Sequence, residues 1–107
     1  PNFEVLTSEA RSVLPDPYSR ADVIFNSSRT ALWPVAVALN QPELLRVASQ
    51  DAIHEPYREK LVPGLAETRQ KVLEAGAYAA FLSGAGPTVG VICSGDVKET
   101  CQSILQT

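Results

Sequence analysis

A small-residue loop between two short apolar runs constrains this chain more than any other feature. Residues 80–82 and 89–93 are the apolar runs, and residues 83–88, Ser-Gly-Ala-Gly-Pro-Thr, join them. Short apolar runs that end at turn signals predict buried strands, so the segment reads as a hairpin. Glycine tolerates positive φ and carries no Cβ, so the loop can also turn its N–H groups toward an anion. A tight turn whose glycines serve only the backbone is the other interpretation of this pattern.

The N-terminal part predicts one strand followed by helices. Residues 2–6 alternate polar and apolar, which favours a strand. Thr7 can cap a helix that continues to about residue 14, before two prolines. Ser19 resembles the cap of a long helix that ends at about residue 40. Apolar residues at helical spacing predict one stripe of that helix facing the core, made up of Ile24, Ala31, Leu32, Val35, Ala38 and Leu39.

The remaining segments predict three more helices. Pro42 begins one that runs to about residue 53, and residues 54–63 form a polar connection between two prolines. Another helix lies between Gly64 and Gly76. The last helix, from about residue 96, turns four side chains to the core: Val97, Cys101, Ile104 and Leu105.

This order of elements predicts an α+β fold, a small and mostly antiparallel sheet covered on one face by helices. A ferredoxin-like split β-α-β motif needs one further strand after the last helix, so we expect that final strand to be missing. Both ends of the chain are expected to be cut from a longer protein.

Charge and cysteine content exclude several classes of function. The 107 residues carry a net charge of −3 with acidic and basic residues interleaved, so we expect neither a nucleic-acid nor a membrane partner. Two cysteines without metal-type spacing favour buried thiols and a reducing cytoplasm. His54 is the one histidine of the chain, and without a second ligand at metal spacing we expect no metal site and either a structural role for it or one that supports the residues contacting a ligand.

Four segments together resemble the homoserine kinase family, within the galactokinase, homoserine, mevalonate and phosphomevalonate (GHMP) kinase superfamily. They are Thr-Ser-Glu-Ala-Arg before Leu-Pro at 7–15, Ala-Asp-Val-Ile-Phe-Asn at 21–26, the segment 51–63 with His-Glu-Pro-Tyr-Arg, and Leu-Ser-Gly-Ala-Gly-Pro-Thr at 82–88. The glycine loop alone would indicate only the superfamily. The resemblance extends over nearly the whole of this chain. It matches only the C-terminal part of the proteins in that family.

This resemblance implies that residues 1–107 are a ferredoxin-like, substrate-side domain, without the N-terminal ATP-binding domain. The complete enzyme would use ATP and Mg²⁺ to phosphorylate the hydroxyl of L-homoserine, in threonine biosynthesis. By the family pattern, Arg11 and Arg58 would hold the substrate carboxylate, and Thr7 would lie near the reacting hydroxyl. The loop would border the phosphate, through Ser83, Gly84, Ala85 and Gly86.

Other interpretations stay open. The chain could be a non-catalytic ferredoxin-like module that binds a small metabolite, or part of another GHMP-family small-molecule kinase. A non-catalytic module would not need Thr7, Arg11 and Arg58 to converge beside the loop. We expect the fragment to be inactive alone, to bind no cofactor tightly, and to be compatible with a homo-oligomer.

Overall fold

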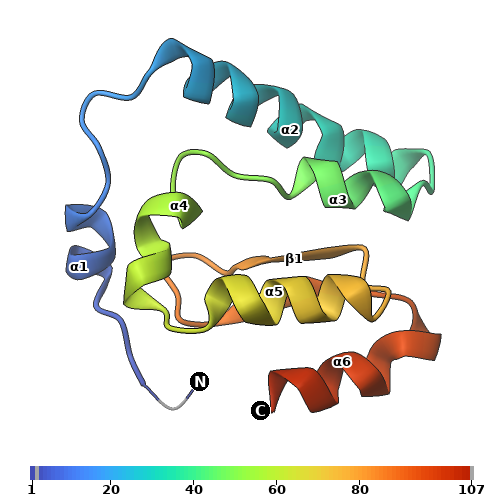
Figure 1. The fold of residues 1–107 in the computed structure, drawn as a ribbon. Helices are drawn as coiled ribbons and strands as arrows, with labels where there is room; N and C mark the ends of the chain where they lie inside the picture. Colours follow the sequence, from blue (N-terminus) through green and yellow to red (C-terminus); the bar gives the residue numbers. More distant parts are fainter. Residues whose placement is uncertain (2, 107) are drawn as a thin grey trace.

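A computed structural model describes residues 1 and 3–106 of the chain (Figure 1). The elements form two groups, mainly helical up to residue 74 and a hairpin with one helix after it. Their bounds are α1 Thr7–Ser12, α2 Arg20–Ala38, η1 Pro42–Leu44, α3 Leu45–Ala48, α4 Glu55–Arg58, η2 Glu59–Leu61, α5 Leu65–Glu74, β1 Ala79–Leu82, β2 Val89–Ile92, η3 Gly95–Val97 and α6 Lys98–Leu105.

The hairpin expected around the glycine loop is present. β1 and β2 pair antiparallel, with Ala79 opposite Ile92 and Leu82 opposite Val89, and they form the two-stranded sheet of the described residues. Within the loop, the Ser83 N–H donates to the Thr88 carbonyl over 2.8 Å. The α+β class predicted from the sequence is therefore confirmed.

Helices cover both faces of this sheet, so the expectation of one covered face is wrong. α2 and α3 lie on one side of the hairpin, and α5 and α6 on the other (Figure 1). Ala79 packs with Ala36 of α2, whereas its neighbour Ala80 packs with Val72 of α5 and Cys101 of α6. Successive apolar residues along a strand point to opposite faces, so a strand without alternation is apolar on both sides.

The apolar stripe expected to face the core lies on the outside of α2. Ile24 and Leu39 are each 61% exposed, and of the six residues only Leu32 is even half-buried. The helix instead packs through Trp33 and Ala36. α2 has apolar residues on more than one side, and periodicity alone does not say which side meets the sheet. The start of α2 is as predicted, because the Ser19 hydroxyl accepts the Asp22 N–H at 3.1 Å.

The N-terminal predictions are corrected. Residues 3–6 form no strand, and Asn2 lies outside the described residues. Residues 3–6 pair with neither of the two described strands, so their N–H and C=O groups have no ladder to join. Val5 packs under the glycine loop, against a cluster that contains Val62, Leu65 and Leu82. Thr7 is the first residue of α1 rather than its cap, since Leu6 precedes the helix and no side chain caps it.

Two helix boundaries also differ from those expected. The helix that begins at Pro42 ends at Ala48, and the polar connection 54–63 contains α4 and η2. At the C-terminus Leu105 is 41% exposed, whereas Cys101 is buried and Val97 and Ile104 pack around it. Both cysteines are free thiols; Cys101 is buried, as predicted, whereas Cys93 is only partly buried. No helix within residues 1 and 3–106 is long and apolar enough to span a bilayer.

Candidate functional site

A hollow of about 530 Å³ gathers most of the residues singled out in the sequence. It lies where α1, α2, α4 and the glycine loop meet, and β1 ends at its edge. Five of the seven expected site residues line it: Thr7, Arg11, Arg58, Gly84 and Ala85. Ser83 and Gly86 do not line it. Segments that are up to 78 positions apart in the chain, from residue 7 to residue 85, thus border one space.

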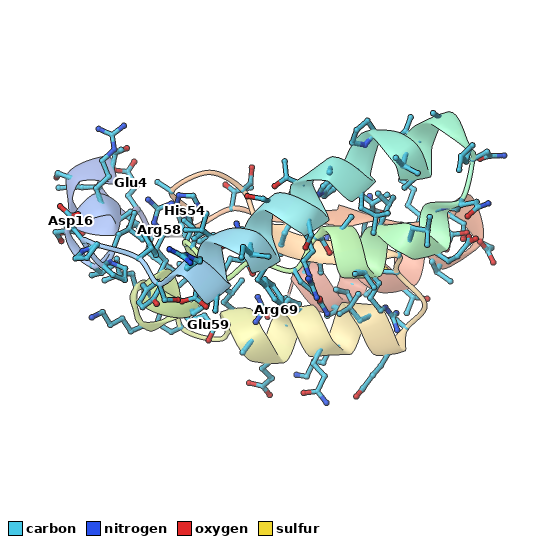
Figure 2. The ribbon with its side chains drawn as sticks, turned by 90° about the horizontal axis from the view of Figure 1, so that it is seen from above. Glu4, Asp16, His54, Arg58, Glu59 and Arg69 are labelled. Carbon is cyan, nitrogen blue, oxygen red and sulfur yellow. The ribbon has the colours of Figure 1, made fainter. Side chains whose placement is uncertain are left out.

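Arg58 is the central cation of this hollow, and it is also a structural link. The residue is only 7% exposed. Its Nε donates to the carbonyl of Ala10 at 3.0 Å, and its Nη1 donates to the carbonyl of Gly84 at 3.2 Å. Figure 2 shows Arg58 beside His54, next to the helix α1. The guanidinium, 48 positions from Ala10 and 26 from Gly84, therefore joins α1 to the glycine loop before any ligand binds.

The glycine loop combines both interpretations of its sequence. Ser83 and Gly86 close the turn, because the Gly86 N–H donates to the Ser83 carbonyl at 3.2 Å. Gly86 has a φ of +91°, and a Cβ there would lie 2.9 Å from Cδ1 of Leu82, so the position requires glycine. The N–H groups of Gly84 and Ala85 have no acceptor among the described residues, and both residues border the hollow. Two backbone donors are therefore available for an anion.

Thr7 and Arg11 lie one turn apart on α1 and both border the hollow. Arg11 is exposed, and within residues 1 and 3–106 no hydrogen bond or ion pair engages its guanidinium. It differs in this from Arg58, whose N–H groups are partly used within the protein. Arg11 is thus the cation of the site that is most available to a ligand.

Sequence reasoning missed the residues that shape the floor of the hollow. Asp51 lies in the segment between α3 and α4, and its carboxylate accepts N–H groups from Ile53, His54 and Glu55 at 2.6–3.0 Å. Asn26 of α2 donates to Asp51 at 2.8 Å and accepts the Ala52 N–H at 2.6 Å. Burial alone would raise the pKa of Asp51, but the hydrogen bonds from these backbone groups and from Asn26 outweigh it and lower the pKa. Asp51 is therefore an anion that fixes the start of α4.

Glu55, the first residue of α4, was missed as well. It is 8% exposed, and one of its carboxylate oxygens accepts the N–H of Leu82, the last residue of β1. The other oxygen lies 2.5 Å from Nη1 of Arg69, whose Nη2 lies 2.5 Å from Glu59. Burial is the main cause that raises the pKa of Glu55 above its usual value, against the opposing effects of Leu82 and Arg69. Glu59 and Arg69 lie side by side in Figure 2.

The contacts that tie these residues to other segments join partners that are far apart in sequence, so no local pattern points to them. Asn26 and Asp51 are 25 positions apart, and Glu55 and Leu82 are 27 apart. The one available signal was that each of these residues lies inside a segment that carries the family resemblance.

His54 borders the hollow. Its side chain is 50% exposed, and Nδ1 lies 4.0 Å from an Asp51 oxygen. Among the residues that the structure describes, no group of three or more His, Cys, Asp or Glu side chains is arranged to hold a metal ion.

Known proteins resemble this chain in sequence and in fold. Residues 35–107 match the family model described as GHMP kinases C terminal. The homoserine kinase of Picosynechococcus sp. is 44% identical over the whole chain, which corresponds to 35% of that protein. The homoserine kinase of Aquifex aeolicus is 52% identical over 83% of the chain and 30% of its own length.

A solved structure agrees with the sequence relatives. The crystal structure of homoserine kinase from Cytophaga hutchinsonii superposes with a TM-score of 0.91 at 26% identity, covering 99% of this chain and 34% of that protein. The chain thus spans about a third of the length of the relatives it matches. By its matching family model, its relatives and its fold, the chain belongs to the GHMP kinase family and corresponds to the C-terminal region of that family.

Proposed function

We propose that this chain is the C-terminal, substrate-side part of a homoserine kinase, whose ATP-binding domain lies outside the 107 residues. The complete enzyme transfers the γ-phosphoryl group of ATP to the side-chain hydroxyl of L-homoserine, in the cytoplasm, as a step of threonine biosynthesis. The observation that carries the proposal is the convergence of Thr7, Arg11 and Arg58 on one hollow beside Gly84 and Ala85. Relatives named homoserine kinase that match over the whole chain support it.

The charges of the hollow suit an amino-acid substrate. Homoserine carries a carboxylate, which a guanidinium can bind through two parallel hydrogen bonds. Arg11 would supply this fork, because its guanidinium has no partner among the described residues. Arg58 would add positive charge from the buried side, where its Nη1 already contacts the Gly84 carbonyl. Thr7, one turn before Arg11, would then lie near the reacting hydroxyl.

Phosphoryl transfer needs positioning and charge neutralisation more than covalent chemistry from the protein. The hydroxyl oxygen of homoserine forms the new bond to the γ-phosphorus, the bond to the ADP oxygen breaks, and the hydroxyl proton is released. The free N–H groups of Gly84 and Ala85 would stabilise the charge that develops on the phosphoryl oxygens. ATP and Mg²⁺ would be held chiefly by residues outside this chain.

A chimera tests this function directly. The chain replaces the matched 107 residues of the Picosynechococcus homoserine kinase, and ADP release is measured with ATP and L-homoserine. We expect homoserine-dependent turnover from the chimera and none from the chain alone. A folded chimera that prefers mevalonate would favour another GHMP-family kinase. A folded chimera that binds homoserine without turnover would favour the non-catalytic module.

Arg11→Ala in the chimera tests whether this arginine binds the homoserine carboxylate. Loss of a charge-assisted pair of hydrogen bonds costs roughly 1.5–3 kcal/mol, which corresponds to a rise of about ten- to a hundredfold in the Michaelis constant for homoserine. The Michaelis constant for ATP should change by less than about twofold. An equal rise for both substrates would contradict the assignment of Arg11 to the homoserine carboxylate.

A further inference from the structure

We propose that Glu55 is a positioning residue for the homoserine site, because it fixes the junction between β1 and the glycine loop against α4 and so holds Arg58 in place. The inference rests on the proposed function for its kinetic consequence. Its structural part concerns only contacts within this chain.

Two residues of one helical turn hold the beginning of the loop at two points. Glu55 accepts the N–H of Leu82, and Arg58 donates to the carbonyl of Gly84, two residues further on. Glu55 and Arg58 are three positions apart on α4, and both are buried, at 8% and 7% exposure. Residues three apart on a helix lie on the same face. The N–H of Leu82 and the C=O of Gly84 are therefore held from a single rigid turn.

Glu55 is fully engaged by the protein and is not free to bind substrate. One carboxylate oxygen is used by Leu82, and the other lies 2.5 Å from Nη1 of Arg69 on α5. The ammonium of an amino acid would have to displace one of these partners. This occupancy distinguishes a positioning group from a ligand of the substrate, although Glu55 lies at the wall of the hollow.

A carboxylate is the group that these contacts require. It offers two acceptor oxygens, one for the Leu82 N–H and one for Arg69. A glutamine has a single acceptor oxygen, and its NH₂ would face a donor on the other side. Glu55→Gln therefore removes one of the two contacts with hardly any change of volume. The loop that carries Gly84 is then no longer fixed at Leu82, so the Arg58 guanidinium loses a firm partner there and its bond to Ala10 opens more often.

Glu59→Gln is the matched control, because Glu59 bonds the same arginine without touching the loop. Its carboxylate lies 2.5 Å from Nη2 of Arg69, and its side chain is 37% exposed. In the chimeric kinase, Glu55→Gln should raise the Michaelis constant for homoserine by about tenfold or more, since small displacements of a positioning group cost up to a hundredfold. The Michaelis constant for ATP, and both constants in Glu59→Gln, should stay within about twofold.

A second measurement does not depend on activity. The Nε–H of Arg58 and the N–H of Leu82 are followed by hydrogen exchange in the 107-residue chain, and both should exchange at least tenfold faster in Glu55→Gln than in Glu59→Gln. A wild-type chimera without homoserine-dependent turnover would refute the proposed function and leave this arm intact. Unchanged exchange of the Arg58 Nε–H in Glu55→Gln, or an equal kinetic loss in both variants, would overturn the role of Glu55.

Discussion

Arg58→Met should destabilise the ligand-free chain, because Arg58 has a structural role in the protein that does not depend on any substrate. The methionine keeps much of the apolar stem and removes the guanidinium. The carbonyls of Ala10 and Gly84 then lose the N–H groups that lie 3.0 and 3.2 Å away. A buried acceptor left without its donor costs roughly 1–3 kcal/mol.

Ala10 is fully buried and bears this cost in full, whereas Gly84 is exposed and water can replace its lost donor, so the expected loss is about 1–3 kcal/mol. Domains of this size have a free energy of unfolding of about 5–15 kcal/mol, so the loss should be readily measured. Urea denaturation followed by the fluorescence of Trp33, the one tryptophan of the chain, provides the assay. Trp33 packs edge-to-face on Phe81 at 5.8 Å and therefore reports on the contact between α2 and the sheet.

Arg11→Met is the matched control for this measurement. Arg11 borders the same hollow, but the described residues give its guanidinium no partner. Its replacement should change the free energy of unfolding by less than about 0.5 kcal/mol, as for other exposed positions. If Arg58→Met also cost less than about 0.5 kcal/mol, Arg58 would be a ligand-binding group only. Its role as a stabilising link between α1 and the glycine loop would then be refuted.

Three further changes test other parts of the structure. Asp51→Ala should lower the free energy of unfolding by roughly 1.5–3 kcal/mol at pH 7, because it removes a charged acceptor of backbone N–H groups. Because folding lowers the pKa of Asp51 from 3.8, its contribution to the free energy of unfolding is present above about pH 4 and is lost as the pH falls through the folded pKa. A stability difference between Asp51→Ala and wild type that persisted undiminished at pH 2 would contradict this pH dependence. Gly90→Ala should cost about 1–3 kcal/mol, since its Cβ would lie 2.6 Å from the Phe81 ring, whereas Gly95→Ala meets nothing within 4 Å and should be nearly neutral in the same urea titration. Gly86→Ala should cost at least about 1 kcal/mol by thermal unfolding, because it adds a methyl group at a φ of +91°, and a melting temperature equal to that of wild type would show that the loop can relax.

The sequence by itself determined the features that depend on neighbouring residues. The hairpin follows from two apolar runs around glycines that allow positive φ, at +61° for Gly84 and +91° for Gly86. The start of α2 follows from Ser19 and its bond to the Asp22 N–H three residues on. In each case the deciding contact lies within a few positions, so a local pattern contains it. The expected site residues came from the family resemblance and not from any such local pattern.

The tertiary structure alone decided which apolar side of α2 meets the sheet and what holds the site. Periodicity predicted a buried stripe with Ile24 and Leu39, but both are 61% exposed, because the contact of Trp33 and Ala36 with the sheet orients the helix. Contacts between residues 25 to 48 positions apart help to fix the hollow, from Asn26 with Asp51 to Arg58 with Ala10. Such contacts form only when packing brings distant segments together, and the energy of a buried charge depends on the groups that then surround it.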